Sequence, residues 1–488
     1  MKKLFCSRRL FLKQATLIAG GIATLPARVR AAASGTTDDV RVAIIGLGGK
    51  GGQHAGNFPG LPGVRVAALC EVDPKRLSAH AEKLKQNGMA PFTANDPRRV
   101  IERDDVDAVV IATPNHWHAL LAVWAMRAGK DVYVEKPVSH NIHEGARMVA
   151  EAKAKGRIVQ AGTQYRSCAG LRAAASWLKE GHVGKPLWAH VPWYEHRPPI
   201  GKCEPFTPKD LDYDLWCGPA PLEPLNRPKL HYDWHWVWST GDGDLGNSGI
   251  HAFDACRMFL PGAVFPRRVL SLGGRFTYDD AAQTPNTQLT LVEYPDLPII
   301  LDNRNLSMRR DTVTMDHVRG IREGFVLQYE GGYFAGLRAG GVVFDKSGKE
   351  LKRFPGDGGA GHAANFVKAI RSRRVEDLHA PVVEGHVSSA VCHLGNLSYR
   401  LGTPCDRKAC EDALGNHASV QEGFDRVAKS LEGIGVDLEK TPFTLGPSLA
   451  IDPASGDIHK TGDGDAAQLD KARALARGSH RAPYTMPI

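Results

Sequence analysis

A lysine and a histidine in this sequence have the types and surroundings that oxidation of an alcohol requires. Lys136 lies in a Glu-Lys-Pro turn after an apolar segment, and His251 lies near the beginning of a helix predicted over 245–260. Removal of a hydride from carbon and a proton from oxygen needs a base and a positive charge near the oxygen. The positive end of the helix dipole lowers the pKa of a histidine and keeps it neutral, as a base must be. We therefore expect both residues to be catalytic, against the alternatives of a solvated loop lysine and a core histidine.

Two polar residues accompany His251 on the predicted helix. Asn247 precedes it by four residues and Asp254 follows it by three, so all three share one helix face. We expect Asn247 to belong to the catalytic group with Lys136 and His251.

A glycine turn that follows an apolar strand predicts a dinucleotide site. Residues 40–46, VRVAIIG, are followed by the spacing Gly46-x-Gly48-x-x-Gly51, and Glu71 ends the next apolar run, 20 residues after Gly51. An acid at this place binds a ribose 2′-hydroxyl and repels a 2′-phosphate, which favours NAD over NADP. Lys75 and Arg76 keep NADP open as the alternative.

Alternating strands and helices up to about residue 160 predict a doubly wound parallel sheet, a Rossmann domain of the α/β class. A capping-box spacing at Asn141 and Glu144 predicts where one of these helices begins, and Gly156 predicts where it ends. Ligands bind beyond the carboxyl ends of such strands. The residues expected on this cofactor side are Thr113, Pro114, Asn115, His118, Glu135 and Lys136.

The sequence changes character beyond about residue 162. Alternating apolar and polar runs between 267 and 308 predict antiparallel strands, and we expect a second, α+β domain with an open, mostly antiparallel sheet. Aromatic and hydrogen-bonding side chains before these strands are candidates for sugar binding, the alternative being packing of alternate tryptophans in a strand. The candidates in this group are Tyr194, Arg197, Trp234 and His235.

Five motifs together resemble the Gfo/Idh/MocA oxidoreductases, the family of glucose-fructose oxidoreductase and inositol dehydrogenase. They are the glycine turn, ATPNHWH, EKPVS, GTQYR and GDLGNSGIHAFD, and the resemblance covers about residues 39–402. It implies a Rossmann domain in 34–162, a substrate and oligomerisation domain in 163–402 and an extension in 403–488. It also implies that Gln164 lies at the cofactor and that Tyr165 and Arg166 lie beside the substrate.

The resemblance implies an NAD(P)-dependent enzyme that transfers a hydride to or from a sugar, cyclitol or related polyol. The family usually has Asp where this chain has Asn247, a difference that removes a charge which Asp244 or Asp254 can replace. Two alternatives stay open: a redox-neutral enzyme that cleaves or epimerises glycosides through a transient keto-sugar, and a non-catalytic NAD-dependent sugar-binding protein. Retention of both Lys136 and His251 argues against the second.

The N-terminal segment predicts export. Residues 7–13, SRRLFLK, match a twin-arginine signal, and an apolar stretch and three alanines follow, so we expect residues 1–33 to be a signal peptide. This predicts a periplasmic protein that is exported folded, with NAD tightly bound, by the twin-arginine machinery. No stable membrane insertion is expected, because no segment has the roughly 20 apolar residues that span a bilayer.

Charge and cysteine content exclude other classes. Removal of the seven lysines and arginines in residues 1–33 lowers the formal charge from +9 to +2, so we expect no nucleic-acid partner. The nine cysteines contain no paired Cys-x-x-Cys spacing, and we expect no metal site. The expected partners are a small carbohydrate and further copies of the chain, in a homodimer or homotetramer.

Overall fold

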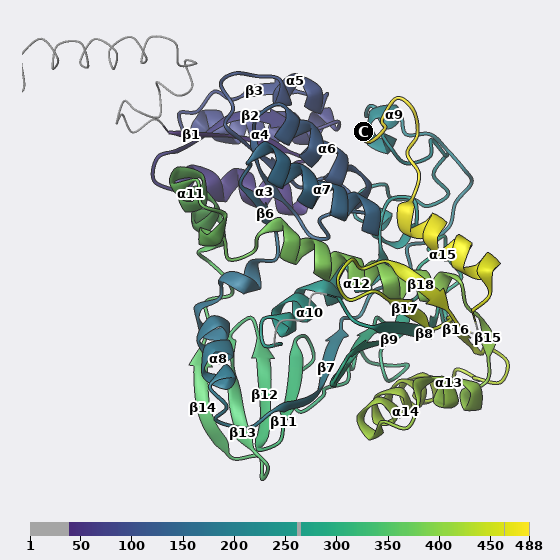
Figure 1. Cartoon of the computed structure of the whole chain (residues 1–488). Helices are drawn as coiled ribbons and strands as arrows, with labels where there is room; N and C mark the ends of the chain where they lie inside the picture. Colours follow the sequence, from purple (N-terminus) through teal and green to yellow (C-terminus); the bar gives the residue numbers. More distant parts are fainter. Residues whose placement is uncertain (1–38, 261–264, 463, 488) are drawn as a thin grey trace, which may run out of the picture. The chain divides into compact units, whose positions relative to one another are not determined.

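The first sheet is parallel and doubly wound, as predicted. The computed structural model describes residues 39–260, 265–462 and 464–487. Six short strands lie in the order β3-β2-β1-β4-β5-β6. Figure 1 shows this sheet with β1, β2, β3 and β6 labelled. Their bounds are β1 Val40–Ile45, β2 Val64–Cys70, β3 Phe92–Ala94, β4 Ala108–Ile111, β5 Asp131–Val134 and β6 Val159–Ala161. Every residue of β4 and β5 is buried, which is typical of strands covered on both faces.

Helices follow these strands and begin at the edge where ligands are expected. They are α3 Gly49–Asn57, α4 Pro74–Gln86, α5 Pro97–Ile101, α6 Asn115–Arg127 and α7 Ile142–Lys155. The predicted ends of α7 are confirmed, since the Asn141 side chain accepts from the Glu144 N–H and Gly156 ends the helix in the left-handed conformation. Because α6 begins directly after β4, Thr113, Pro114 and Asn115 lie at the carboxyl edge of the sheet.

The second sheet is mixed and mostly antiparallel, which confirms the predicted fold class. Its main path is β14-β13-β12-β11-β7-β10-β9-β8-β16-β15, and only β7 and β10 are paired in parallel. The bounds are β7 Pro186–Tyr194, β8 Arg268–Gly274, β9 Thr287–Tyr294, β10 Leu297–Arg304, β11 Phe325–Tyr329, β12 Gly332–Leu337, β13 Gly340–Asp345, β14 Glu350–Pro355, β15 Thr403–Cys405, β16 Phe443–Leu445, β17 Leu449–Ile451 and β18 Ile458–Thr461. Residues after 402 therefore add strands to this sheet.

Helices cover both faces of the second sheet around β8–β10 (Figure 1). On one face, Val269 and Val292 belong to the core that packs against α10 and α12, whereas on the other face Leu270 and Leu291 pack against α13 and α14. This alternation is the period of two of a β-strand. The bounds are α8 Ala169–Lys179, α9 Tyr213–Cys217, α10 Ile250–Arg257, α11 His362–Ser372, α12 Val382–Arg400, α13 Arg407–Leu414, α14 Ala418–Gly433 and α15 Ala466–Arg477.

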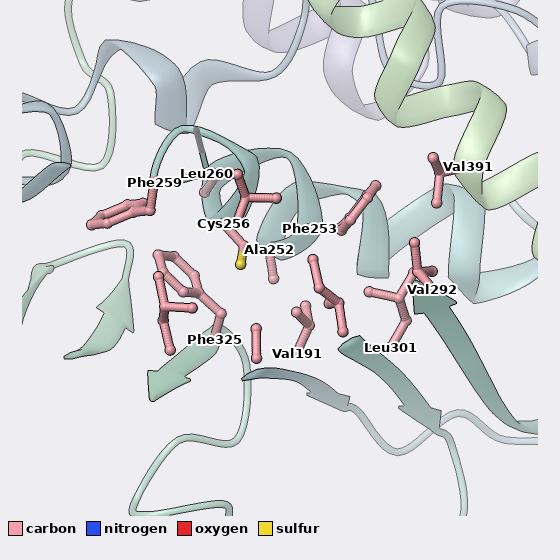
Figure 2. Packing of buried hydrophobic residues seen from close by; sticks show 14 of the residues in the cluster. Val191, Ala252, Phe253, Cys256, Phe259, Leu260, Val292, Leu301, Phe325 and Val391 are labelled. Atoms are coloured by element: carbon pink, nitrogen blue, oxygen red, sulfur yellow. The ribbon is translucent and has the colours of Figure 1, made fainter. Parts of the chain in front are cut away.

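The core under α10 fixes the position of His251. Figure 2 shows Ala252, Phe253 and Cys256 of α10 directed onto the sheet, against side chains that include Val191 and Leu301. The three helix residues are fully buried. Since His251 is the neighbour of Ala252 on the same short helix, this packing holds the histidine at one end of the sheet.

Two segments differ from the sequence predictions. Residues Leu245–Gly249, predicted as part of one continuous helix, form a π-helical turn before α10. Residues Asp233–Trp236 form a 3₁₀ turn, so the alternative that the tryptophans belong to a strand is wrong. π-helical turns are frequent at functional sites, whereas short 3₁₀ turns are common as connectors.

The predicted signal peptide, 1–33, lies outside the described residues. Within the described ranges, no helix is long and apolar enough to cross a membrane. The same part of the chain contains no group of three or more histidine, cysteine or acidic side chains able to hold a metal ion.

Candidate active site

A cavity of about 530 Å³ lies at the carboxyl edge of the first sheet. Its walls come from the turns after β1, β2, β4 and β5, from Leu215 and Trp216, from the segment 231–235, and from Asn247 and His251. Nine of the predicted site residues on the Rossmann side and four on the opposite side therefore line this one cavity. They are Gly46, Gly48, Glu71, Thr113, Pro114, Asn115, His118, Glu135 and Lys136, together with Trp234, His235, Asn247 and His251. Lys50, which was not predicted, lines the cavity as well.

The glycine turn leaves no room for side chains at two positions. Gly46 has φ +84°, and a Cβ there would lie 2.7 Å from the backbone oxygen of Ala112. A Cβ on Gly51 would lie 1.7 Å from the backbone oxygen of Gly46. Gly51 does not line the cavity itself, but it lets α3 approach the turn closely, which is the role of the third glycine in a dinucleotide fingerprint.

Glu71 is held by the turn that it faces. Its Oε2 accepts from the backbone N–H of Leu47 at 2.7 Å, and its Oε1 accepts from that of Asp73 at 3.1 Å. Arg76 also lines the cavity, and its guanidinium lies 3.3 Å from the Asp73 carboxylate. An acid therefore follows the end of β2, and the arginine that lines the cavity, Arg76, is paired with another acid.

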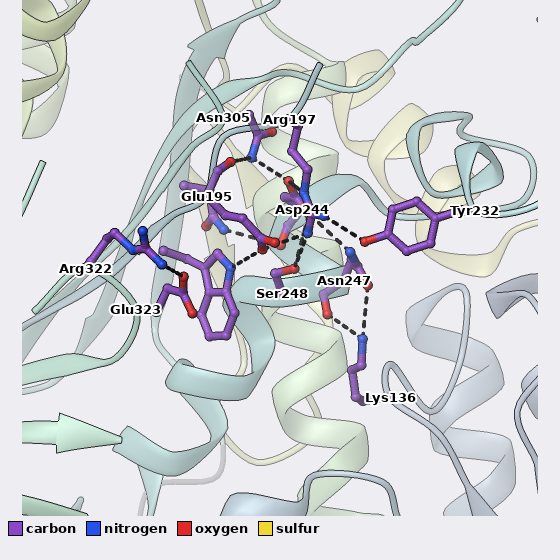
Figure 3. A network of polar contacts seen from close by, with 12 residues as sticks. Lys136, Glu195, Arg197, Tyr232, Asp244, Asn247, Ser248, Asn305, Arg322 and Glu323 are labelled. Carbon is purple, nitrogen blue, oxygen red and sulfur yellow. Dashed lines mark hydrogen bonds and ion pairs between the residues drawn. The ribbon is translucent and has the colours of Figure 1, made fainter. Parts of the chain in front are cut away.

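The Lys136 ammonium lies opposite the π-helical turn. Its Nζ donates to the backbone oxygen of Asn247 at 2.5 Å and to Asn247 Oδ1 at 3.1 Å (Figure 3). Burial lowers the pKa of Lys136 to about 8, with Glu135 opposing and Lys50 reinforcing that effect. Lys136 is thus charged at neutral pH and able to give up its proton within a pH range that proteins experience. Its peptide bond to Pro137 is cis.

Glu135 supplies a negative charge beneath this lysine. Its Oε1 lies 2.9 Å from His54 Nε2, a pairing that sequence reasoning missed. Burial raises the pKa of Glu135, but the His54 hydrogen bond and the charges of Lys50 and Lys136 outweigh it and hold that pKa well below its usual range. Glu135 is therefore an anion, and it stabilises the ammonium of its neighbour.

His251 has the properties of a neutral base. Its ring lines the cavity and meets Tyr165 edge to face, with the ring centres 5.4 Å apart. Burial lowers its pKa well below the ordinary value, and the charge of Lys136 lowers it further, whereas the sequence argument had assigned this effect to the helix dipole. Its Nδ1 is buried without a hydrogen-bond partner among the described residues.

Asp244 is the carboxylate that contacts Asn247. Its Oδ1 accepts from Asn247 Nδ2 at 3.2 Å, and its Oδ2 accepts from Asn305 and from Arg197 (Figure 3). Asp254, the other acid considered, lies 2.8 Å from the Arg166 guanidinium and accepts from Ser388. Of the two acids, Asp244 is therefore the one in contact with Asn247.

The turn between β4 and α6 adds polar groups to the cavity. His118 lies 2.8 Å from the backbone oxygen of Thr113 and 2.6 Å from that of Pro137, so both of its ring nitrogens face carbonyls. Asn115 donates to Asp242 at 2.8 Å, which ties the first turn of α6 to the second domain. Thr113 Oγ1 is buried without a hydrogen-bond partner in the described structure, so it has a free polar atom at the cavity wall.

Other predicted residues do not line the cavity. Tyr194 is fully buried and donates from its hydroxyl to Asp302 at 2.6 Å. Arg166 forms a buried ion pair with Asp254, and Tyr165 lies behind His251. Gln164 lies in the 3₁₀ turn after β6, outside the cavity lining. The resemblance indicates Gln164, Tyr165 and Arg166, and its aromatic type indicates Tyr194, but neither kind of argument reveals the direction of a side chain.

Arg197 acts from behind the cavity wall. Its guanidinium donates to the hydroxyl of Tyr232 at 2.7 Å and to Asp244, and Tyr232 lines the cavity. Trp234 and His235 stack with their ring centres 3.6 Å apart and contribute a flat face to the same wall. Sequence reasoning missed Tyr232 and Lys50, although Lys50 is the one charged residue between Gly46 and Gly51.

The fold and the cavity define a class: two-domain proteins in which a dinucleotide-binding Rossmann domain faces a second domain built on a large mixed sheet. Residues 40–163 match the model of the oxidoreductase family, NAD-binding Rossmann fold, and residues 201–421 match that of the oxidoreductase family, C-terminal alpha/beta domain. The chain belongs to the Gfo/Idh/MocA oxidoreductase family.

Curated relatives carry names of glycoside-cleaving enzymes. A glycosyl hydrolase family 109 protein of Shewanella pealeana is 33% identical over 168 residues, which are 30% of this chain and 37% of that protein. An alpha-N-acetylgalactosaminidase of Shewanella oneidensis is 33% identical over 159 residues, which are 28% of this chain and 35% of that protein. The chain thus spans little more than a third of the length of these relatives.

Solved structures share the fold at low identity. The aldose-aldose oxidoreductase from Caulobacter crescentus, complexed with glycerol, superposes with a TM-score of 0.55 and 18% identity, covering 73% of this chain and 97% of that one. At this identity the likeness concerns the fold alone.

Proposed function

We propose that this protein transfers a hydride between a tightly held NAD and a secondary alcohol of a sugar, cyclitol or related polyol. The observation that carries the proposal is that Lys136 and His251 line the same cavity as the glycine turn and Glu71. A charged ammonium and a neutral imidazole are the two groups that alcohol oxidation requires.

The residues present fit a dinucleotide. Gly46 and Gly51 allow the turn and α3 to pack closely, and Gly48 lines the cavity without a side chain, so a pyrophosphate can approach the backbone there. The Glu71 carboxylate suits a ribose 2′-hydroxyl, which favours NAD over NADP. The unpartnered Thr113 hydroxyl is a further polar contact available to it. NAD, when bound, accepts the hydride from the alcohol carbon or returns it.

Side chains of the protein accept the proton and stabilise the charge on the oxygen. His251, kept neutral by burial and by the nearby ammonium, accepts the proton of the alcohol, while Lys136 stabilises the negative charge that develops on the oxygen. Asn247 orients the ammonium through two hydrogen bonds. Trp234, His235 and Tyr232 give a flat, partly polar wall that suits a sugar ring.

A second candidate function is a redox-neutral cleavage or epimerisation of a glycoside. In this reaction the alcohol is oxidised only transiently, and at the keto stage a base removes the proton from the neighbouring carbon. In cleavage the glycosidic oxygen then leaves as an alcohol and water adds in its place, whereas in epimerisation the proton returns on the opposite face. The hydride finally returns to the same sugar. Two observations favour it: the names of the relatives, and the pKa of about 8 that makes Lys136 a second proton-exchanging group near neutral pH. A ketone makes the hydrogen on the neighbouring carbon acidic, and removal of that proton requires a proton-exchanging group.

The test combines a substrate screen with variants. Purified protein is mixed with sugars, polyols and glycosides while the absorbance of bound nicotinamide and the release of products are followed. Net oxidation changes the absorbance in proportion to product, whereas a redox-neutral reaction releases product with no lasting change. Lys136→Ala and His251→Ala should each slow hydride transfer about 100-fold or more and still retain NAD.

The control for these variants is His143→Ala, because His143 is an exposed histidine on α7 away from the cavity. Near-normal turnover in either catalytic variant would remove the role assigned to that residue. Loss of NAD from both variants, with none from the control, would mean that the two residues bind the cofactor and do not act on the proton.

Export is proposed as part of this function. A Rossmann site takes up its dinucleotide only when folded, so passage through the twin-arginine machinery delivers a loaded enzyme to the periplasm, where we place it. We also propose that the protein assembles as a homodimer or homotetramer, which light scattering of the purified holoenzyme tests.

A further inference from the structure

One wall of the cavity is a short segment that needs support. Leu215 and Trp216 of α9 line the cavity, and the chain leaves α9 through Gly218 and Ala220. The helix has only five residues, too few to be stable by itself. The contacts that other elements make with this segment therefore determine whether the wall stays closed.

The first support comes from α6. The Trp117 indole N–H donates to the backbone oxygens of Leu215 and Trp216 at 3.2 and 3.1 Å, and His116 Nε2 lies 3.1 Å from the Trp216 oxygen. Trp117 also lines the cavity. A Cβ on Gly218 would lie 2.1 Å from its ring, so the segment lies directly against the indole.

The second support comes from the C-terminal segment, far away in sequence. Arg481 donates from Nε to the backbone oxygens of Gly218 and Ala220 at 3.0 and 3.1 Å, and its two terminal nitrogens donate to the side chain and backbone oxygen of Asp214 at 2.7 and 2.9 Å. The Arg481 backbone N–H donates to Pro219. One guanidinium thus joins both ends of the wall segment.

Tyr484 contacts Trp117 and the wall segment from the same side as Arg481. Its ring is buried and meets the Trp117 ring edge to face with centres 5.4 Å apart, and its hydroxyl donates to Asp214 at 3.1 Å. Trp117 is therefore held between the cavity and Tyr484. Before these two residues, His480 Nε2 lies 2.7 Å from Glu144 Oε1 on α7, which anchors the C-terminal segment to the first domain.

We propose that residues 478–486, the C-terminal clasp, hold the 213–220 wall over the cofactor cavity, with Arg481 and Tyr484 as positioning residues that slow release of the dinucleotide. The clasp lies beyond residue 421, where the match to the second family model ends. The inference rests on the proposed NAD site. Such a clasp suits a protein that keeps its cofactor through many turnovers. A closed wall slows dissociation of the dinucleotide without touching the reacting atoms.

The test measures the rate at which bound NADH leaves, from its fluorescence after dilution into excess NAD. Arg481→Ala and Tyr484→Ala should each raise this rate about tenfold or more, the factor that the loss of one charge-assisted or buried hydrogen bond corresponds to. Arg481→Lys should lie between wild type and Arg481→Ala, since an ammonium cannot make both pairs of contacts at once. Hydride transfer within the complex that is still loaded should stay within about twofold of wild type.

Lys471→Ala is the matched control, because it removes an exposed positive charge from α15 in the same C-terminal region. A merely structural role would lower the melting temperature of the NAD-free variants and leave the NADH dissociation rate at the wild-type value, and this result would overturn the proposal. If Arg481→Ala does not fold, the NADH dissociation rates of Arg481→Lys and Tyr484→Ala test the proposal by the same criterion. Failure of the proposed function has a different signature: the wild-type protein itself would not bind NADH.

Discussion

Lys136 bonds twice to one residue, Asn247: its ammonium donates to the backbone oxygen at 2.5 Å and to Oδ1 at 3.1 Å. Asn247 Nδ2 in turn donates to Asp244 Oδ1 at 3.2 Å, so an uncharged amide separates the lysine from the nearest carboxylate of the second domain. An amide orients an ammonium but raises its pKa less than a carboxylate would. Burial lowers the pKa of Lys136 to about 8, and the Asn247 amide holds the ammonium in place without placing another carboxylate against it.

The first prediction concerns the alkaline limb of the pH profile. The pKa of Lys136 is lowered to about 8, so the charged form that stabilises the developing oxyanion is present below that pH and is lost above it. Hydride transfer should therefore decline as the pH rises through about 8. Lys136→Arg keeps its charge at every pH up to about 12 and should abolish this limb in whatever activity remains. Stopped-flow measurement between pH 6 and about 10 checks this, and an alkaline limb that survives in Lys136→Arg would contradict it.

The second prediction concerns Asn247→Asp. The new carboxylate faces Lys136 and should raise the pKa values of Lys136 and His251, so both limbs of the pH profile should move to higher pH. The same carboxylate lies next to Asp244, whose oxygen is 3.2 Å from the present amide nitrogen. We expect this like-charge contact to lower the free energy of unfolding by about 1–3 kcal/mol at neutral pH and less in acid.

Denaturant unfolding of Asn247→Asp at pH 5 and pH 7.5, together with its pH–rate profile, measures both effects. Asn247→Ala is the control, since it removes the amide without adding a charge. If the profile of Asn247→Asp stays at the wild-type pH values, Asn247 is not electrostatically coupled to the catalytic pair.

The third prediction compares two glycines of α3. Gly51→Ala forces a Cβ to within 1.7 Å of the Gly46 backbone oxygen, so the turn must open and NADH binding should weaken by at least about 100-fold. Gly56→Ala is the matched control in the same helix, because nothing lies within 4 Å of its Cβ position. It should bind NADH normally and stabilise the protein by about 0.5–1 kcal/mol through helix propensity. Equal NADH affinities of the two variants, measured by fluorescence titration, would show that the turn does not bind the dinucleotide.

The features that could be predicted from the sequence are those with local causes. The strand before Gly46, the acid at the end of β2 and the caps of α7 each depend on residues close together in the chain, and the structure has them where the patterns indicate. The period of two in β8 and β9 likewise reflects the two faces of the sheet.

Features with distant causes could not be predicted. Tyr194 belongs to the last six residues of β7, which are all buried, so its sequence neighbours do not show that its hydroxyl is directed at Asp302 and not at the cavity. The Arg481 contacts join residues more than 260 positions apart. The π-helical turn at Asn247 directly precedes α10, which packs on the sheet, and no short sequence pattern encodes such a turn.

The fourth prediction concerns export. Arg8→Lys combined with Arg9→Lys should leave full-length, NAD-loaded and active protein in the cytoplasm, because the receptor for twin-arginine signals reads the arginine pair and folding does not depend on it. Fractionation of tagged protein, with NAD content measured in each fraction, makes the comparison, and the wild-type signal serves as the control. Mature protein in the periplasm at the wild-type amount in the double variant would contradict it.

The most direct test of the central claim is the absorbance of the protein's own nicotinamide. Protein purified without added nucleotide is mixed in a stopped-flow instrument with a panel of sugars, polyols and glycosides, and Lys136→Ala is measured in parallel. The account predicts a transient or lasting absorbance change of reduced nicotinamide with at least one carbohydrate, slowed about 100-fold or more in Lys136→Ala. A wild-type protein that carries NAD and gives no absorbance change with any member of the panel, or one that reacts equally fast without Lys136, would contradict it.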